Sequence, residues 1–147
     1  MRKVLTILAA VLLASAAGLA REDSIDTLKQ RAQAAKSGDQ AKLFSEIARR
    51  EVEAADQLYT SGESEKAKNT LRDAVFSAER ASHAAEQSGK QLKETEIKMR
   101  KLSKRVDEIK HTLAVEDRPP LEAAIQTLEQ LRRDLLARMF GHNKGKS

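Results

Sequence analysis

The feature that most constrains this chain is a run of small or apolar residues at alternating intervals of four and three positions. The members of the run are Ala67, Leu71, Ala74, Ala78, Ala81, Ala85, Ser88, Leu92, Thr95, Met99, Leu102, Val106, Ile109 and Leu113. This spacing is typical of a heptad seam, in which one stripe of a helix packs against a partner helix. The run therefore predicts one long helix over residues 64–115 that passes through Gly89.

The position of Gly89 leaves an alternative open. Ser-Gly also occurs at Ser37-Gly38 and Ser61-Gly62, where helical patterns stop, so Ser88-Gly89 is either a third turn or part of the long helix. A glycine inside a helix costs only about 1 kcal/mol relative to alanine. The unbroken spacing favours the continuous helix, because two separate helices have no reason to share a register across a turn.

Shorter helices are predicted before this run. No segment after the first twenty residues alternates with the two-residue period of a strand, so the fold class is all-α. Ser24 is placed to cap a helix over about residues 24–36. Gly38 is placed to end that helix and Asp39 to cap the next one, over about residues 40–60.

Two prolines determine how the chain continues. Pro119 and Pro120 stop the long helix and are acceptable in the first turn of a last helix, over about residues 120–140. The short connection makes this helix fold back antiparallel. The predicted architecture is a small helical bundle with a long central helix and a C-terminal antiparallel coiled-coil hairpin, followed by a disordered basic tail at residues 141–147. The heptad seam also permits self-association.

The N-terminal segment has the order of residues of a secretory signal peptide. Arg2 and Lys3 precede an apolar stretch of about ten residues and then small residues. A membrane span needs about 20 apolar residues. We therefore expect cleavage after Ala16 or Ala20 and an exported protein, in the periplasm or outside the cell, that is not an integral membrane protein after cleavage. The alternative is an N-terminal anchor.

The composition of the chain argues against binding of nucleic acids. Without residues 1–20 the chain has 127 residues, and its 25 basic and 22 acidic side chains leave a net charge of +3. Tryptophan and cysteine are absent, and the only aromatic residues are Phe44, Tyr59, Phe76 and Phe140. Aromatic platforms for bases therefore lack material, and we expect no nucleic-acid partner.

The sequence offers no recognisable catalytic, cofactor or metal site. Glu108 and His111 form half of the Glu-x-x-His pattern of di-metal helical bundles, but Val106 and Ile109 define the inner face and turn this pair outward. Pairs of carboxylates two positions apart, such as Glu51 with Glu53 and Glu94 with Glu96, point to different sides of a helix. We interpret them as solvated faces, and we predict that the protein is not an enzyme.

Residues 51–79 resemble a tetratricopeptide-repeat helical hairpin. The matching positions are Ala55, Leu58, Tyr59, Gly62, Ala67, Leu71 and Ala74. The resemblance implies one hairpin of this shape, not a tandem array, with a groove that holds a peptide or another protein.

These observations favour a non-catalytic exported protein that binds protein partners as an adaptor or scaffold. We expect contacts at Tyr59, at Phe76 and on the alanine-rich half of the long helix. One alternative is a cell-envelope holdase chaperone. Another is a binder of anionic envelope polymers through the basic helix 90–110, where Lys98, Lys101, Lys104 and Arg105 are the candidate residues. An ordinary solvated face, with salt bridges to Glu122 or Glu129 on the last helix, would also explain this basic segment.

Overall fold

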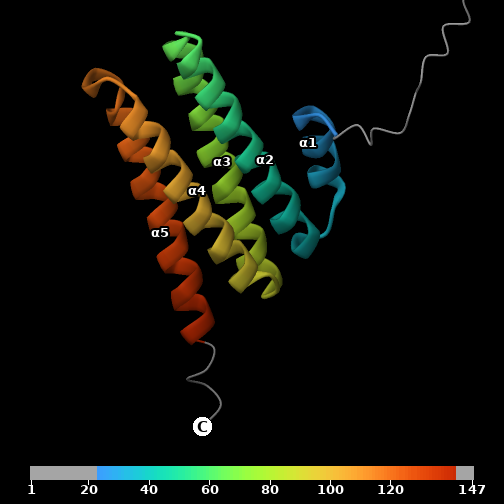
Figure 1. Cartoon of the computed structure of the whole chain (residues 1–147). Coiled ribbons are helices and arrows are strands. Elements are labelled where there is room, and N and C mark those ends of the chain that lie inside the picture. Colours follow the sequence, from blue (N-terminus) through green and yellow to red (C-terminus); the bar gives the residue numbers. More distant parts are fainter. Residues whose placement is uncertain (1–22, 142–147) are drawn as a thin grey trace, which may run out of the picture.

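The computed structural model describes residues 23–141, and this range folds into five α-helices and one short 3-10 helix, without a strand (Figure 1). The elements are α1 (Ile25–Ala34), α2 (Ser37–Thr60), α3 (Ser64–Ser88), α4 (Leu92–Thr112), η1 (Val115–Asp117) and α5 (Pro119–Gly141). The predicted all-α fold class is confirmed. The predicted signal peptide and nearly all of the predicted tail lie outside the described residues.

The four long helices run alternately up and down the molecule. Figure 1 shows α2 and α3 as one antiparallel hairpin and α4 and α5 as a second one. The two hairpins pack side by side, so that α2 contacts α4 and α3 contacts α5. The short helix α1 packs against α2, near the end where α2 begins. Each long helix therefore packs against its partner in the same hairpin and against a helix of the other hairpin, as in a four-helix bundle, and α3 also contacts α4.

The predicted continuous helix over residues 64–115 is wrong. The chain turns back between Ser88 and Leu92, where Gly89 and Gln91 adopt left-handed backbone conformations with φ angles of 64° and 67°. The side-chain oxygen of Ser88 accepts a hydrogen bond from the backbone N–H of Lys90 over 3.1 Å and supports this turn. A second break follows at the end of α4, before η1. The third Ser-Gly pair therefore marks a turn, as the alternative interpretation held.

The roles predicted for Gly38 and Asp39 are also wrong, because both residues lie in the first turn of α2. The chain leaves α1 through extended backbone at Ala35. The side-chain amide of Gln40 donates a hydrogen bond over 3.0 Å to the carbonyl of Ala32, near the end of α1. A side chain therefore satisfies this helix end, and a left-handed glycine is not needed there.

Other local signals in the sequence are confirmed. Ser24 caps α1, since its Oγ accepts a hydrogen bond from the N–H of Thr27 over 3.1 Å. Gly62 has a φ of 80° in the turn between α2 and α3, a conformation that glycine adopts without strain. Pro119 and Pro120 occupy the first turn of α5, where a missing N–H costs nothing.

The core runs the length of the bundle. The alanine stripe of α3 packs mainly against α2, and Ala67, Ala74, Ala78, Ala81 and Ala85 are all nearly inaccessible. The expectation that this stripe is a free contact surface is therefore wrong. At the other side of the bundle, α4 packs along α5 and buries Met99, Leu102, Val106, Ile109, Leu121, Leu128 and Leu135. This antiparallel pairing was predicted.

Within residues 23–141, no helix has both the length and the apolar character that a membrane crossing requires.

Candidate functional site: a basic groove between α2 and α4

The contact between α2 and α4 leaves two adjoining hollows on the surface, each of about 280 Å³. They share Ser45 and Lys98 as lining residues, and we call the two hollows together the α2–α4 groove. The residues that line it are Ala41, Lys42, Ser45, Arg49, Val52, Glu53, Gln91, Glu94, Thr95, Lys98, Lys101, Leu102 and Arg105. Between Gln91 and Arg105 the groove extends over about 21 Å, at a rise of about 1.5 Å per helical residue.

The charge of the α2–α4 groove is positive. Five basic and two acidic side chains line it, a net charge of +3. Helices α2 and α4 both contribute basic residues, Lys42 and Arg49 from α2 and the other three from α4. The positive charge therefore depends on the packing of two segments that are about fifty residues apart in the sequence.

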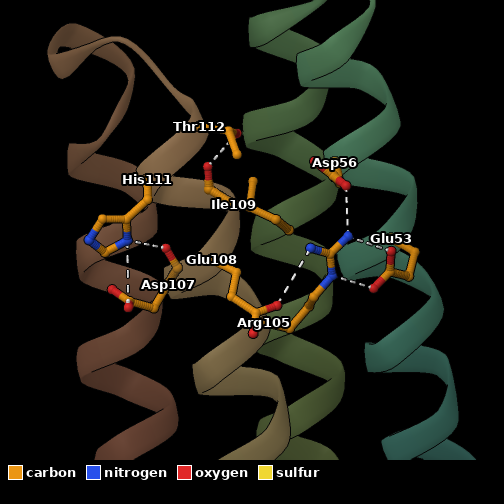
Figure 2. Close-up of polar contacts among 8 residues, drawn as sticks. All are labelled: Glu53, Asp56, Arg105, Asp107, Glu108, Ile109, His111 and Thr112. Carbon is orange, nitrogen blue, oxygen red and sulfur yellow. Dashed lines mark hydrogen bonds and ion pairs between the residues drawn. The ribbon is translucent and has the colours of Figure 1, made fainter.

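Arg105 closes one end of the groove and links α4 to α2. Its Nε and Nη2 atoms donate to the two carboxylate oxygens of Glu53 over 2.8 and 3.0 Å, and Nη2 also donates to Asp56 over 2.7 Å (Figure 2). Its Nη1 lies 3.8 Å from Glu108. The hydrogen bond from Arg105 lowers the pKa of Glu53, and the same pair raises the pKa of Arg105. Arg105, one of the predicted binding residues, is therefore engaged within the chain.

The remaining basic residues of the groove differ in their pairing. Arg49 makes a bidentate contact with Glu46, over 2.7 and 3.0 Å. By contrast, Lys42, Lys98 and Lys101 have no ion-pair partner within residues 23–141. All three are exposed. The groove thus holds three ammonium groups that are available to an anionic ligand.

The floor of the groove is apolar. Val52 and Leu102 lie between the charged residues, and only 2% and 4% of their surfaces are accessible. At the other end of the groove the floor is formed by Ala41 and Thr95, which are also buried. A ligand in the groove would therefore meet aliphatic atoms below and ammonium groups at the sides.

Lys104, the last predicted member of the basic site, lies outside the groove on the solvent side of α4. The expected salt bridges from the basic segment to Glu122 or Glu129 on the last helix are wrong. Glu129 pairs with Arg132 on its own helix, over 3.2 Å. The α4–α5 ion pair has the opposite polarity, because Glu96 of α4 accepts a hydrogen bond from Arg132 over 2.7 Å. Lys98 and Lys101 lie on the flank of α4 that faces α2, so α5 does not reach them.

Two predicted contact residues, both aromatic, have different environments. Tyr59 is half-buried and packs against the core near the end of α2. Burial raises its pKa, and the charges of Asp117 and Glu65 add to this effect. Phe76, in the middle of α3, is 58% exposed. Of these two rings, Phe76 is thus the one that a partner reaches without a rearrangement.

Arg80 joins Phe76 to a neighbouring ring. The guanidinium carbon of Arg80 lies 4.6 Å from the centroid of the Phe44 ring and 5.8 Å from that of Phe76. These distances are in the range of cation–π contacts. Arg80 also borders a hollow of about 330 Å³ with His83 and Gln40. We call a set of five residues the α3 patch: Phe76, Arg80 and His83 of α3, together with Gln40 and Phe44 of α2.

Two carboxylates that were interpreted as parts of solvated faces, Glu51 and Glu96, are in fact buried. The exposed fraction of Glu51 is 3%, and Ser77 on α3 donates a hydrogen bond to it over 2.6 Å. Its second oxygen lies 3.7 Å from Nζ of Lys29 on α1. Burial is the main cause that raises the pKa of Glu51. Its burial could have been found from its position on the apolar stripe of α2, because Glu51 lies four residues after Ile47 and four residues before Ala55.

The outward orientation predicted for Glu108 and His111 is confirmed, since both side chains are exposed. Figure 2 shows His111 directed back toward its own helix, where its Nδ1 donates to the carbonyl of Asp107 over 2.7 Å. In the part of the chain that the structure describes, no group of three or more histidine or carboxylate residues lies close enough to hold a metal ion.

Comparison with protein-family models, with curated proteins and with solved structures gave no match.

Proposed function

We propose that this chain is a non-catalytic, exported helical protein that acts as an adaptor or scaffold by binding another protein at the α3 patch. The observation that carries the proposal is the position of Arg80 between two aromatic rings, one buried and one exposed. Phenylalanine and arginine are among the residue types enriched in protein interfaces, and arginine is also enriched among the residues that dominate the binding energy.

The chemistry of Arg80 supports this proposal. Within residues 23–141 its guanidinium makes no ion pair and no side-chain hydrogen bond, and its contacts are the two rings. Its N–H donors are therefore free for a carbonyl or carboxylate of a partner. The rings also limit the conformations of the side chain, which reduces the entropy lost on binding.

The exposure of Phe76 supports the same surface. Large apolar side chains with an exposed fraction above one half are Phe76, Val115 and Phe140 in the described range. Val115 lies in a connection and Phe140 lies at the end of α5, whereas Phe76 lies in the middle of a long helix. The hollow beside Arg80, which Phe44 lines and Phe76 does not, adds a concave surface to the α3 patch.

The resemblance to a tetratricopeptide-repeat hairpin remains a prediction. The α2–α3 hairpin has helices of 24 and 25 residues, whereas a whole tetratricopeptide unit with both helices takes about 34 residues. The proposal therefore does not depend on that resemblance.

Photo-crosslinking in cells that produce the protein tests the proposal. A crosslinking residue at the exposed position His83 should capture one discrete protein, and the same residue at Gln126 on α5 should not. Phe76→Ala should weaken binding of the captured and purified partner by about 2 kcal/mol, the usual size of an interface hot spot, or about 30-fold in Kd.

Two results would contradict the adaptor function. Capture of many unrelated unfolded proteins at His83 would favour a holdase chaperone instead. Binding of the purified partner that does not change on Phe76→Ala, while circular dichroism shows an intact fold, would exclude the α3 patch as the interface.

A further inference from the structure

The α2–α4 groove has features that the proposed function does not use. We propose that it is a second binding site, separate from the α3 patch, and that its ligand is an acidic segment of a protein. Carboxylates of the segment would pair with Lys98 and Lys101, and an apolar side chain between them would pack on the aliphatic stems of these lysines.

The lysines provide the first step of the argument. Lys98 and Lys101 are three residues apart on α4, and residues at this spacing lie on neighbouring positions of a helix surface, about 5–6 Å apart. Neither has an ion-pair partner within residues 23–141, and Lys42 lines the same groove from α2. Two ammonium groups side by side repel each other, and an anionic ligand between them would relieve this repulsion.

The shape of the groove sets the size of the ligand. A depression of about 21 Å, at a rise of about 1.5 Å per helical residue, accommodates about six residues of an extended chain at about 3.4 Å each. Val52 and Leu102 have almost no accessible surface left to cover, but the aliphatic stems of the exposed lysines on the walls of the groove can pack on an aliphatic side chain of a ligand, and burial of such surface is favourable. A short peptide can carry both charge and aliphatic side chains.

The acidic residues of the groove favour a protein segment over a uniformly charged polymer as its ligand. Glu53 lines one end of the groove and Glu94 lines the other. Arg105 compensates the charge of Glu53, but a polymer with a negative charge on every unit would also place a charge beside Glu94, which has no ion-pair partner within residues 23–141, and this is unfavourable. A peptide can carry its carboxylates only where Lys98 and Lys101 lie, so the groove matches a protein segment better.

A binding titration with purified protein tests this inference. The probe is a fluorescently labelled six-residue peptide that carries two glutamates, separated by one leucine, among leucine and glycine residues, and its counterpart has glutamine in place of both glutamates. The groove variant is Lys98→Gln with Lys101→Gln. The matched control is Lys93→Gln with Lys104→Gln, which removes the same charge from exposed positions of α4 outside the groove.

The inference predicts that the glutamate peptide binds and the glutamine peptide does not. At about 0.15 M salt the groove variant should weaken binding about ten-fold or more, which corresponds to about 1.4 kcal/mol, and the control variant should weaken it less than about two-fold. The Phe76→Ala variant should bind the peptide normally, so that this test and the test of the α3 patch give separate answers.

Three results would overturn the inference. The first is an equal loss of binding in the groove variant and the control variant, which indicates attraction by net charge alone. The second is no binding of the glutamate peptide, or equal binding of both peptides. The third is tighter binding of inorganic polyphosphate or of anionic phospholipid vesicles that depends on Lys98 and Lys101, which would assign the groove to a polymer or a membrane surface instead.

Discussion

Arg105 of α4 holds the carboxylate of Glu53 on α2 with two parallel hydrogen bonds, over 2.8 and 3.0 Å. The two residues are more than fifty positions apart, so their contact exists only because the chain turns back at Gly89. The contact joins the two helical hairpins at one end of the α2–α4 groove. The same contact therefore holds α4 against α2 and forms one end of the candidate site.

Arg105→Ala should lower the free energy of unfolding by about 1 kcal/mol, since the pair is bidentate but partly exposed to solvent. The measurement is denaturation in urea. Arg100→Ala is the control, because Arg100 is exposed on the same helix and has no ion pair in the described range; it should change the free energy by less than about 0.5 kcal/mol. Equal losses in the two variants would mean that the pair contributes nothing specific.

The same pair should give stability that depends on pH. The hydrogen bond from Arg105 holds the pKa of Glu53 below its ordinary value of 4.5. A carboxyl group whose pKa is lowered on folding contributes stability above its unfolded pKa, and that contribution is lost as the pH falls through the folded value. The difference in stability between the wild type and Arg105→Ala should thus be full at pH 7 and shrink below pH 4.5. A difference that stays constant would contradict this assignment.

Glu51 should behave in the opposite way. Burial raises its pKa above 4.5, so the folded protein binds this proton more tightly than the unfolded chain, and ionisation at neutral pH costs stability. Glu51→Gln keeps an acceptor for the hydroxyl of Ser77 and removes the charge, so it should raise the free energy of unfolding at pH 7, and the gain should vanish below pH 4.5. Urea titrations at several pH values measure this effect. A loss of stability at pH 7 would show that the Lys29 pair outweighs the cost of burial.

Substitution of serine by alanine should have opposite effects on stability at two positions of α3, Ser82 and Ser77. Ser82 Oγ is buried and has no hydrogen-bond partner among residues 23–141, so Ser82→Ala should leave stability unchanged or raise it by up to about 1 kcal/mol. Ser77→Ala should lower it by about 1–3 kcal/mol, because Glu51 then loses its donor. Thermal denaturation of both variants tests the pair, and destabilisation by Ser82→Ala would indicate a partner for that hydroxyl.

The sign of the change in the free energy of unfolding on Gly89→Ala distinguishes the observed turn from a continuous helix. At a φ of 64° alanine is strained, and we expect a loss of about 1 kcal/mol. In a continuous helix the same change would stabilise by about 1 kcal/mol. Gly38→Ala is the control, because Gly38 is helical and a Cβ there meets nothing within 4 Å; this variant should be neutral or stabilised.

Much of the fold could be predicted because it depends on local signals. The stripes of apolar residues, the cap at Ser24 and the prolines at the start of α5 each act over a few residues. The turn at Gly89 could not be predicted from spacing, because α3 ends at Ser88 and α4 begins four positions later at Leu92, which preserves the intervals of four and three. The left-handed conformation of Gln91 has no signal of its own, since non-glycine residues adopt it rarely.

The candidate site was predicted only in part. Lys98, Lys101 and Arg105 were identified from the charge of their segment, but their separation from Lys104 follows from the packing of α4 against α2. That packing also places Lys42 and Arg49 of α2 in the same groove, and no local pattern connects these residues to α4. The burial of Glu51 was missed because a carboxylate on an apolar stripe needs Ser77 from another helix to be accommodated.

The distance between spin labels at Glu65→Cys and Thr112→Cys is the most direct test, because the α2–α4 groove exists only if the chain turns back at Gly89. The chain has no other cysteine, and both positions are exposed. The bundle places both labels at one end of the molecule, so the distance should be below about 30 Å, given helix axes about 10 Å apart. A continuous helix would separate them by about 70 Å at about 1.5 Å per residue, and a distance near that value would contradict the fold and the groove together.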